Sequence, residues 1–390
     1  MIVVRQRDGS IKAFINACRH RGSQLCTAEA GCARNFVCNY HGWTYGLDGE
    51  LLVVPLEKEL YRPSFDKPNH GLRPVPLLES FHGFVYSCFD TNAPSLLDYL
   101  GDMAWYLEIW MDAMNGIELV GPRGRSFLNC NWKIPAENFV GDAYHIGWTH
   151  GAALQALGAK KDRVGNAHLF ADGPGYQATT RHGHGLGSAF DPSAGLLGEV
   201  GKEINAWQAT RREKIDKKLG KLRGRYYGYH MNGNILPNNS FLWGTMTFKL
   251  WAPKGPEGVE VNTWAIVEKD MPQELKDTVM MTTNRMFGTG GMLESDDADN
   301  METITQVNRG YVTQQGYLNS QMGLGMEHEH PEMPGLVSDI GMGETGYRGF
   351  YRFYQEMLNA PSWDDFRKGD ATWKDGVLGT SEAAGKGAQA

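Results

Sequence analysis

Residues 131–150 read NWKIPAENFVGDAYHIGWTH, and the interpretation of the whole chain starts from this stretch. It concentrates carboxylate, amide, phenol and imidazole side chains in one short amphipathic segment, which a helix built only for packing does not need. We interpret the segment as a helix that carries metal ligands. Its polar side chains are Glu137, Asn138, Asp142, Tyr144, His145 and His150.

Helical geometry tests this interpretation. Asp142 and His145 are three residues apart and share a face, whereas His145 and His150 point about 140° away from each other on a straight helix. An uninterrupted helix therefore does not aim both imidazoles at one metal. A widened turn solves this problem, and we place it at Gly147 because glycine tolerates unusual backbone angles. The alternative is a surface helix with two unrelated histidines.

An iron(II) site with two histidines needs a third, anionic ligand. Residues 293–299 read LESDDAD, which places four carboxylates near the start of an expected helix. Acidic residues at a helix start also compensate the helix dipole. The residues alone therefore do not decide between a ligand and a structural role, or between Asp296 and Asp297.

Two motifs near the N-terminus have the spacing of an iron–sulfur site. One is Cys-x-His and the other is Cys-x-x-His, so each of two loops supplies one thiolate and one imidazole. A Rieske [2Fe–2S] cluster needs two cysteines on one iron and two histidines on the other. A structural zinc site, the alternative, more often pairs cysteine with cysteine. The predicted cluster ligands are Cys18, His20, Cys38 and His41.

The composition limits the class of protein. The chain has 390 residues, a formal net charge of −7 and a pI of about 6.0, which does not favour binding to nucleic acid or to an anionic membrane. It contains no apolar run long enough to span a bilayer and no secretory signal. Its six cysteines are better explained as ligands or buried thiols than as a disulfide framework. We therefore expect a cytoplasmic protein.

The expected fold class is α+β. Short β-branched and aromatic runs separated by turns predict a small all-β module, with a hairpin over 43–54. Alternation over 241–251 and 259–267 predicts an antiparallel sheet, and a strand over 126–134 leads into the ligand helix. His182 and His184 are placed in a glycine-rich loop, packed or solvated, without a metal. Helices are expected over 94–110, 201–220 and 272–287.

The chain is expected to contain two domains and a tail. The predicted bounds are 1–95 for an all-β iron–sulfur domain, 96–379 for an α+β domain with helices over an antiparallel sheet, and 380–390 for a disordered tail.

Several of these motifs resemble a known family. CRHRG and CNYHGWTYGLDGEL resemble the Rieske domain of aromatic-ring-hydroxylating dioxygenase large (α) subunits. The resemblance covers nearly the whole chain and is greatest to the naphthalene and polycyclic-hydrocarbon branch. The matching segments are 18–22, 38–51, 137–150, 236–240, 264–272, 293–303 and 347–351.

The resemblance implies a fold, a reaction and two cofactors. The implied protein is a terminal oxygenase that uses O2 and two electrons to convert naphthalene or a larger polycyclic hydrocarbon to a cis-dihydrodiol. The cofactors are a Rieske [2Fe–2S] cluster and a mononuclear non-haem iron(II). The implied iron ligands are His145, His150 and Asp297, with Asp296 beside them.

The implied catalytic residues are Asp142 and Asn138. In the family, the aspartate connects the iron ligand His145 to a cluster histidine of a neighbouring subunit, here His41. A carboxylate between two imidazoles orients both rings and gives electrons a bonded route. The alternative is a simple partner to His145 within one chain.

The implied substrate-binding residues are mainly apolar, as a hydrocarbon site requires. Where naphthalene enzymes carry tryptophan just before the ESDD run, this chain has leucine, so we expect a pocket that admits rings larger than naphthalene. The residues are Phe139, His230, Asn232, Leu242, Phe287 and Leu293.

The predicted reaction requires partners, because a cluster stores one electron and dihydroxylation consumes two. No G-x-G-x-x-G follows a strand that we predict, so the chain is not expected to bind NADH itself. The resemblance implies a ferredoxin and an NAD(P)H-dependent reductase as electron donors, a small β subunit, and an α3 or α3β3 oligomer.

Two questions stay open at this point. Family chains carry a segment before the Rieske strands, and here only 2–6 precede the first turn, so we expect the N-terminal part of that domain to be missing. The alternative functions are a Rieske monooxygenase or demethylase, and a pure Rieske electron-transfer protein. The electron-transfer alternative leaves the 131–150 and 293–303 motifs without a purpose.

Overall fold

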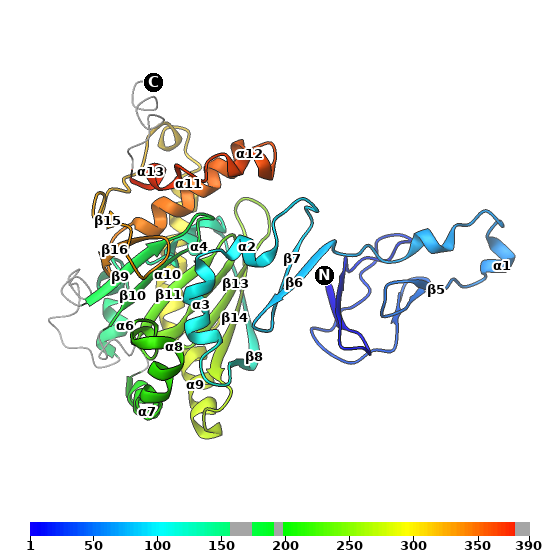
Figure 1. The fold of residues 1–390 in the computed structure, drawn as a ribbon. Coiled ribbons are helices and arrows are strands. Elements are labelled where there is room, and N and C mark those ends of the chain that lie inside the picture. Colours follow the sequence, from blue (N-terminus) through cyan, green and yellow to red (C-terminus); the bar gives the residue numbers. More distant parts are fainter. Residues whose placement is uncertain (157–173, 191–197, 379–390) are drawn as a thin grey trace. The chain divides into compact units, whose positions relative to one another are not determined.

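The computed structural model describes residues 1–156, 174–190 and 198–378. The chain forms two units, Met1–Leu96 and Leu97–Ala390 (Figure 1). Each unit has its own cluster of buried hydrophobic side chains. The tail predicted over 380–390 lies outside the described residues.

The first unit is built from short antiparallel strands. They are β1 (Ile2–Arg5), β2 (Ile11–Phe14), β3 (Phe36–Val37), β4 (Thr44–Tyr45), β5 (Leu51–Val53), β6 (Leu77–Phe81) and β7 (Phe84–Cys88), with the short helix α1 (Glu57–Leu60). β1 pairs with β2, β6 pairs with β7, and β3, β4 and β5 form a three-stranded sheet. The expected hairpin over 43–54 is β4 and β5, which turn at Gly49 with φ +91°. This agrees with the predicted all-β module.

The second unit is organised around a nine-stranded antiparallel sheet within its described residues. The strands are β8 (Ile117–Leu128), β9 (Pro174–Thr179), β10 (Gly185–Ala189), β11 (His230–Ile235), β12 (Asn239–Leu242), β13 (Thr247–Pro253), β14 (Val259–Glu268), β15 (Glu327–His328) and β16 (Leu336–Ile340). Their order is β15-β16-β9-β10-β11-β12-β13-β14-β8. Every residue of β10, β11 and β12 is buried, so the centre of the sheet is covered on both faces.

Helices provide this cover. They are α2 (Leu96–Leu100), α3 (Met103–Met111), α4 (Lys133–Asn138), α5 (Ile146–Thr149), α6 (Gly151–Ala156), α7 (Gly198–Ala209), α8 (Arg212–Tyr226), α9 (Gln273–Phe287), α10 (Met292–Val307), α11 (Thr345–Asn359), α12 (Trp363–Arg367) and α13 (Trp373–Leu378). α3 and α8 lie side by side across the sheet (Figure 1). α9 packs along β14 and against α10, while α11 packs on β9 and β10. The α+β class predicted from the sequence is confirmed.

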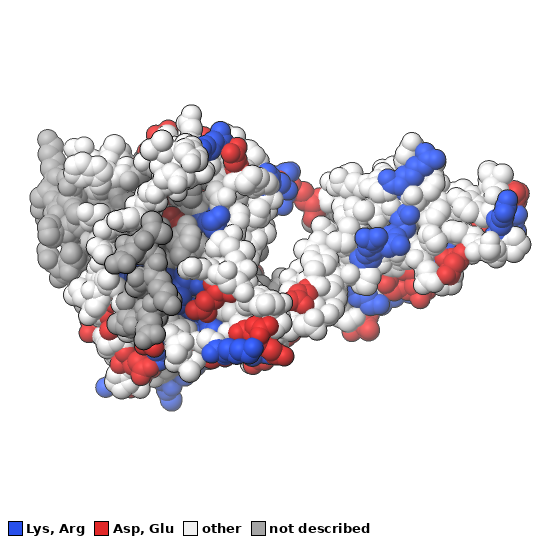
Figure 2. Space-filling model, turned by 90° about the horizontal axis from the view of Figure 1, so that it is seen from above, with Lys and Arg blue, Asp and Glu red and all other residues white. Residues whose placement is uncertain are grey.

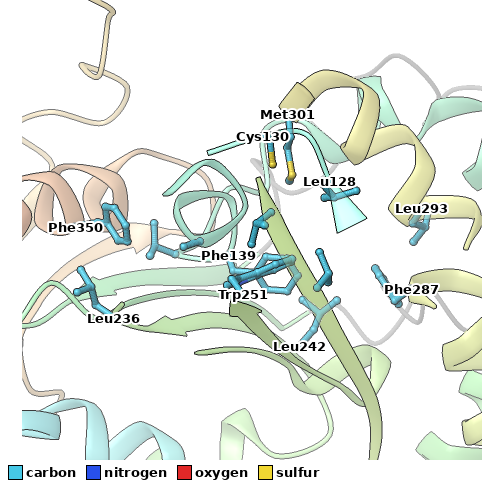
Figure 3. Packing of buried hydrophobic residues seen from close by; sticks show 14 of the residues in the cluster. Leu128, Cys130, Phe139, Leu236, Leu242, Trp251, Phe287, Leu293, Met301 and Phe350 are labelled. Atoms are coloured by element: carbon cyan, nitrogen blue, oxygen red, sulfur yellow. The ribbon is translucent and has the colours of Figure 1, made fainter. Parts of the chain in front are cut away.

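One core cluster lies where the sheet meets α10 and α11 (Figure 3). In it, Trp251 of β13 packs edge to face on Phe139, with ring centroids 5.4 Å apart. Phe139 belongs to the stretch that follows α4, so this contact holds that stretch against the sheet. Burying one such side chain contributes about 1.5–3 kcal/mol before the loss of chain entropy.

The expectation that no G-x-G-x-x-G follows a strand is wrong. GMGETG at 341–346 lies between β16 and the first turns of α11. β16 pairs antiparallel with β9, so this motif is not part of the parallel βαβ unit that binds a dinucleotide.

Four predicted elements have different bounds. The helix predicted over 94–110 is two helices, α2 and α3, separated at Gly101 with φ +49°. The run predicted over 241–251 is divided by a short turn into β12 and β13. The strand predicted over 126–134 ends at Leu128, because the next backbone donors bond to side chains of α10: the amide of Asn129 donates to Glu302 and that of Asn131 to Thr305. The helix predicted over 201–220 is two helices, α7 and α8. The hydroxyl of Thr210 donates to a carbonyl of α7, a side-chain bond that competes with helix continuation.

On the face drawn in Figure 2, acidic and basic side chains are intermixed on both units. Among the described residues, no helix combines the length and the apolar character that crossing a bilayer requires.

The buried histidine His184 is expected to make the folded protein less stable in acid. Its Nδ1 accepts a hydrogen bond from the amide of Leu236 at 3.0 Å, and its Nε2 donates to the carbonyl of Tyr99 at 2.9 Å. Burial, helped by the neighbouring His182, lowers the pKa of His184 to about 3. An unfolded histidine titrates near 6.5, so only the unfolded chain binds this proton between these values, and folding stability falls as the pH falls through that window.

We therefore expect His184→Gln to be less stable than the wild type at pH 7 but to lose less stability between pH 6.5 and 4. Between pH 6.5 and 4, the free energy of unfolding should fall further in the wild type than in the variant, by on the order of a few kcal/mol. Urea unfolding at a series of pH values measures this difference. His328→Gln, at a half-exposed histidine, serves as the control. Equal slopes in the wild type and His184→Gln would contradict the assignment.

Candidate metal centres and the adjoining pocket

The first unit brings the four predicted cluster ligands together. The sulfurs of Cys18 and Cys38 are within hydrogen-bonding contact. The rings of His20 and His41 lie with their centroids 4.5 Å apart and their planes at 67°. The two thiols thus form one close pair and the two imidazoles another, as the two irons of such a cluster require.

The two ligand loops close in the same way. In each loop, a glycine amide donates a hydrogen bond to the carbonyl of the cysteine four residues earlier: Gly22 to Cys18, and Gly42 to Cys38. Both glycines have positive φ, +77° and +73°. Because other residues rarely adopt this conformation, the two glycines explain why each loop can turn tightly enough to present both of its ligands.

The donor set fits a Rieske cluster. Among the described side chains, Nδ1 of His20 is a buried nitrogen without a hydrogen bond, as expected for an atom reserved for a metal. Burial raises the pKa of the Cys38 thiol, but hydrogen bonds from the amide of Tyr40 and from Cys18 lower it below its usual value. The thiolate is the form that binds metals. Trp43 stacks on His20 at 5.0 Å and holds the plane of its ring.

The hydroxyl of Tyr45 is expected to raise the reduction potential of the cluster. Its buried hydroxyl accepts a hydrogen bond from the amide of Arg19 at 2.9 Å and lies 3.3 Å from Sγ of Cys18. The hydroxyl hydrogen is thus left to point at the sulfur, and such a bond stabilises the more negative, reduced cluster. We expect Tyr45→Phe to lower the reduction potential by roughly 40 mV, taking one hydrogen bond as about 1 kcal/mol.

A redox titration followed by EPR measures this shift. Tyr61→Phe is the control, because Tyr61 contacts Trp43 with ring centroids 6.4 Å apart, and no hydrogen bond to a cluster ligand is found for it in the described part of the chain. An unchanged potential in Tyr45→Phe would count against a hydrogen bond to the sulfur.

The stretch 131–150 is not one helix. α4 and α5 are separated by a bend in which Gly141 has φ +116°. A Cβ on Gly141 would lie 2.9 Å from the amide nitrogen of Gly187 in β10, and the carbonyl of Gly141 accepts a hydrogen bond from Gln177 at 2.6 Å. The break predicted at Gly147 is therefore wrong: Gly147 lies inside α5, and the close approach to the sheet requires the bend at Gly141.

This bend allows both histidines to face α10. His145 and His150 flank the single turn of α5, and their Nε2 atoms lie 3.4 and 3.2 Å from the same Oδ1 of Asp297. Ligand atoms of the three residues all lie within 4.8 Å of one another. Two imidazoles and one carboxylate converging from one side form the donor set of non-haem iron(II) sites.

The other ring nitrogens face carboxylates. Nδ1 of His145 is 3.3 Å from Asp142, and Nδ1 of His150 is 3.3 Å from Asp296. A carboxylate at Nδ1 fixes the tautomer and turns the lone pair of Nε2 toward a metal. The two aspartates that the sequence could not separate thus have different neighbours, because Asp297 faces both Nε2 atoms and Asp296 faces the back of one ring.

The electrostatics of this group also fit a cation. Burial alone lowers the pKa of His145, yet Asp142 and Asp297 raise it to about 10. Burial alone raises the pKa of Asp297, yet His145 and His150 hold it well below its usual value. The carboxylates therefore favour positive charge at the point where the three residues meet, which a divalent metal would supply.

A pocket opens beside these three residues. Its wall is formed by β11, β12, the end of α9 and the start of α10, and Figure 3 shows Leu242, Phe287 and Leu293 around the same space. A second pocket shares Asn138, Asp142 and His145 with the first and extends to Glu137 and Tyr347. All six predicted substrate residues line the first pocket: Phe139, His230, Asn232, Leu242, Phe287 and Leu293.

Sequence reasoning missed one charged pair beside this pocket. Lys249 of β13 is fully buried and its ammonium bonds to Glu294 in the first turn of α10. The available signal was a lysine inside the otherwise apolar run TFKLWAP. Buried lysines are rare unless they are paired.

Comparison with known families identifies the chain. Residues 1–73 match the Rieske [2Fe–2S] domain, and residues 96–360 match the family described as ring hydroxylating alpha subunit (catalytic domain). This chain belongs to the ring-hydroxylating α subunits. It is therefore the large component of a ring-hydroxylating dioxygenase, with a Rieske [2Fe–2S] cluster and a mononuclear non-haem iron as cofactors.

Individual relatives agree with this family assignment. The chain is 46% identical to the large oxygenase component of the naphthalene 1,2-dioxygenase system of Pseudomonas aeruginosa, over 98% of this chain and 86% of that one. It is 45% identical to the large oxygenase component of the 2,4-dinitrotoluene dioxygenase system of Burkholderia sp. (strain RASC), over 98% and 85%. The crystal structure of a naphthalene 1,2-dioxygenase mutant bound to phenanthrene has a TM-score of 0.92 and 45% identity, over 96% and 85%.

Proposed function

We propose that this α subunit converts naphthalene or a larger polycyclic aromatic hydrocarbon to a cis-dihydrodiol, consuming O2, two electrons and two protons. The observation that carries the proposal is the position of His145, His150 and Asp297, which line one end of a pocket whose other walls are mainly apolar. A ring held in such a pocket would lie beside the three proposed ligands.

The residues have distinct roles in this proposal. His145, His150 and Asp297 would hold the iron, while Asp142 and Asp296 orient the two imidazoles. When bound, the iron supplies the centre at which dioxygen is activated beside the ring. Apolar walls exclude water and determine which edge of the hydrocarbon is presented. The amide of Asn138, 3.5 Å from His145, contacts the same imidazole as Asp142.

Electrons reach this site from outside the chain. We propose that Cys18, His20, Cys38 and His41 hold the cluster, and that a ferredoxin and an NAD(P)H-dependent reductase recharge it. In this scheme, Asp142 connects His145 to His41 of a neighbouring subunit. The side chain of Asp142 is 40% exposed, so its carboxylate is open to a group from another chain.

We further propose an α3 or α3β3 assembly with a small β subunit. Large apolar side chains in the segment that begins at the end of α10 are exposed, and Val312 and Tyr317 are 82% and 99% exposed. Apolar side chains concentrated on a surface commonly mark an interface. A cytoplasmic location fits the six cysteines, none of which forms a disulfide in the described residues.

Product analysis with ¹⁸O2 tests the reaction. The reconstituted enzyme is assayed against naphthalene, phenanthrene, a four-ring hydrocarbon and 2,4-dinitrotoluene. The proposal expects two labelled oxygen atoms in one diol product. A single labelled atom would indicate a monooxygenase or demethylase, and cluster oxidation without any hydroxylated product would indicate an electron carrier.

Leu293 provides a test of substrate size. It is 1% exposed, lines the pocket and precedes the acidic run of α10. Replacing it with tryptophan fills space in a packed wall, so three- and four-ring substrates should lose roughly tenfold or more in kcat/KM relative to naphthalene. Competition between naphthalene and phenanthrene in one reaction measures the ratio. Unchanged discrimination in Leu293→Trp would refute the idea of a pocket enlarged at this position.

A further inference from the structure

Lys249 holds an unusual position for a lysine. It lies in the middle of β13, its side chain is fully buried, and its Nζ has three hydrogen-bond partners. These are Oε2 of Glu294 at 2.5 Å, the carbonyl of Phe287 at 3.3 Å and Oγ1 of Thr263 at 3.3 Å. An ammonium has three donors, so this cation is fully satisfied and its position is fixed.

Two of these partners belong to the wall of the proposed substrate pocket. Phe287 is the last residue of α9 and lines the pocket. Glu294 follows the pocket residue Leu293 and precedes the proposed iron ligand Asp297 by three positions. Residues three apart share one side of a helix. A single cation on the sheet therefore ties together the two helix ends that carry the pocket wall and the acidic ligand.

Within the described residues, the start of α10 has no side-chain N-cap. Gly291 stands at its N-cap, where no side chain accepts a hydrogen bond from the helix amides. The nearby rings leave little freedom for the cation, since Nζ lies 5.4 Å from the ring of Trp251 and 6.0 Å from that of Phe287. The bond between Lys249 and Glu294 is thus a directional contact that fixes the start of α10 on the sheet, beside the contacts of Asp296 and Asp297 to the histidines.

Stability alone does not explain a buried ion pair at this position. Taking two charges out of water costs as much as or more than their attraction returns, and apolar residues of similar volume commonly replace such pairs without loss. A directional bond, however, fixes a distance that apolar packing leaves adjustable. This difference favours a positioning role.

We propose that Lys249 is a positioning residue, which sets the location of Asp297 and Leu293 relative to Phe287 through its bonds to Glu294 and to the end of α9. Iron affinity and the choice of ring edge then depend on the same ion pair. The proposal deepens the proposed function, because it takes Asp297 as an iron ligand and Phe287 and Leu293 as pocket walls.

The test compares a variant that removes both charges of the ion pair with one that removes only the carboxylate. The main variant is Lys249→Met combined with Glu294→Met, and Glu294→Gln is a milder one that keeps an acceptor for Lys249. The control is Arg211→Met combined with Glu268→Gln, which removes a partly buried ion pair, 3.3 Å apart, that lines neither pocket. Arg211 also pairs with Asp270, whose side chain is 28% exposed and can be solvated in the variant. Each protein is purified as the complete α subunit with its partner chains.

Three measurements separate positioning from stability. They are thermal unfolding, the iron(II) concentration that half-fills the mononuclear site, and the EPR spectrum of the nitric oxide adduct of that site. We expect the double variant at 249 and 294 to bind iron about tenfold or more weakly, to give an altered adduct spectrum and to change the ratio of diol regioisomers. Glu294→Gln should change these in the same direction but less, and the control should change only thermal unfolding.

Wild-type iron affinity, spectrum and regioisomer ratio in the double variant would overturn the positioning role, whatever its thermal stability. If the double variant does not fold, the same three measurements on Glu294→Gln decide, and wild-type values there would overturn the positioning role. A wild-type protein without iron beyond its cluster would overturn the proposed function itself, so the two failures are distinguishable.

Discussion

Replacing Asp142 with asparagine is expected to stop multiple turnover while both metal centres stay in place. One carboxylate oxygen of Asp142 lies 3.3 Å from Nδ1 of His145, and the side chain remains 40% exposed. In the proposed scheme, this carboxylate joins two imidazoles, whereas an amide has one acceptor and no charge. Loss of a carboxylate bonded to a metal-binding histidine typically costs 10–100-fold, and we expect the cluster of the reduced enzyme to reoxidise about 100-fold more slowly.

Stopped-flow mixing of the reduced enzyme with hydrocarbon and O2 measures this rate. Asp296→Asn is a matched control, because Asp296 also lies 3.3 Å from the Nδ1 of a proposed ligand, His150, but has no proposed role in electron transfer. We expect Asp296→Asn to lower iron occupancy, while iron-loaded molecules reoxidise their cluster at the wild-type rate. Reoxidation at the wild-type rate in Asp142→Asn would mean that electrons take another route.

Asp297→Ala is expected to remove the mononuclear iron and to leave the Rieske cluster intact. The carboxylate supplies the only anionic donor of the proposed site within the described residues, and its Oδ1 lies within 3.4 Å of both Nε2 atoms. Two imidazoles alone hold iron(II) poorly, since such sites use a carboxylate as the third ligand. Diol formation should fall below detection, while the visible spectrum of the cluster stays unchanged.

The nitric oxide adduct of the reduced protein reports this loss directly, because only the mononuclear site gives that EPR signal. Asp299→Ala is the control: Asp299 lies in the same acidic run of α10 but is exposed and absent from both pockets. A full adduct signal in Asp297→Ala would show that another group completes the site.

The cluster motifs could be predicted from the sequence because each one specifies the geometry of a single loop. Each cluster loop contains its own ligands and its own closing glycine, so the spacing of Cys18 to His20 and of Cys38 to His41 already defines a loop. The iron site was only partly readable. His145 and His150 are near each other in the chain, but the third ligand comes from α10, and the choice between Asp296 and Asp297 depends on how that helix is rotated against the sheet.

The errors have a common physical cause, which is contact with distant segments. The bend at Gly141 exists because β10 approaches its backbone, and β10 was not predicted. That strand, GLGSA, is buried on both faces, so it lacks the alternation that marks a half-exposed strand. Lys249 was missed for the same reason, since its partners lie at the ends of two helices that follow much later in the chain.

Iron and acid-labile sulfide counted together in the purified wild-type protein test the central claim most directly. One chain that holds a two-iron, two-sulfide cluster and a separate iron should contain about three irons and two sulfides. We expect this ratio, with the third iron alone removed by Asp297→Ala. A ratio of two irons to two sulfides in active protein would contradict the account.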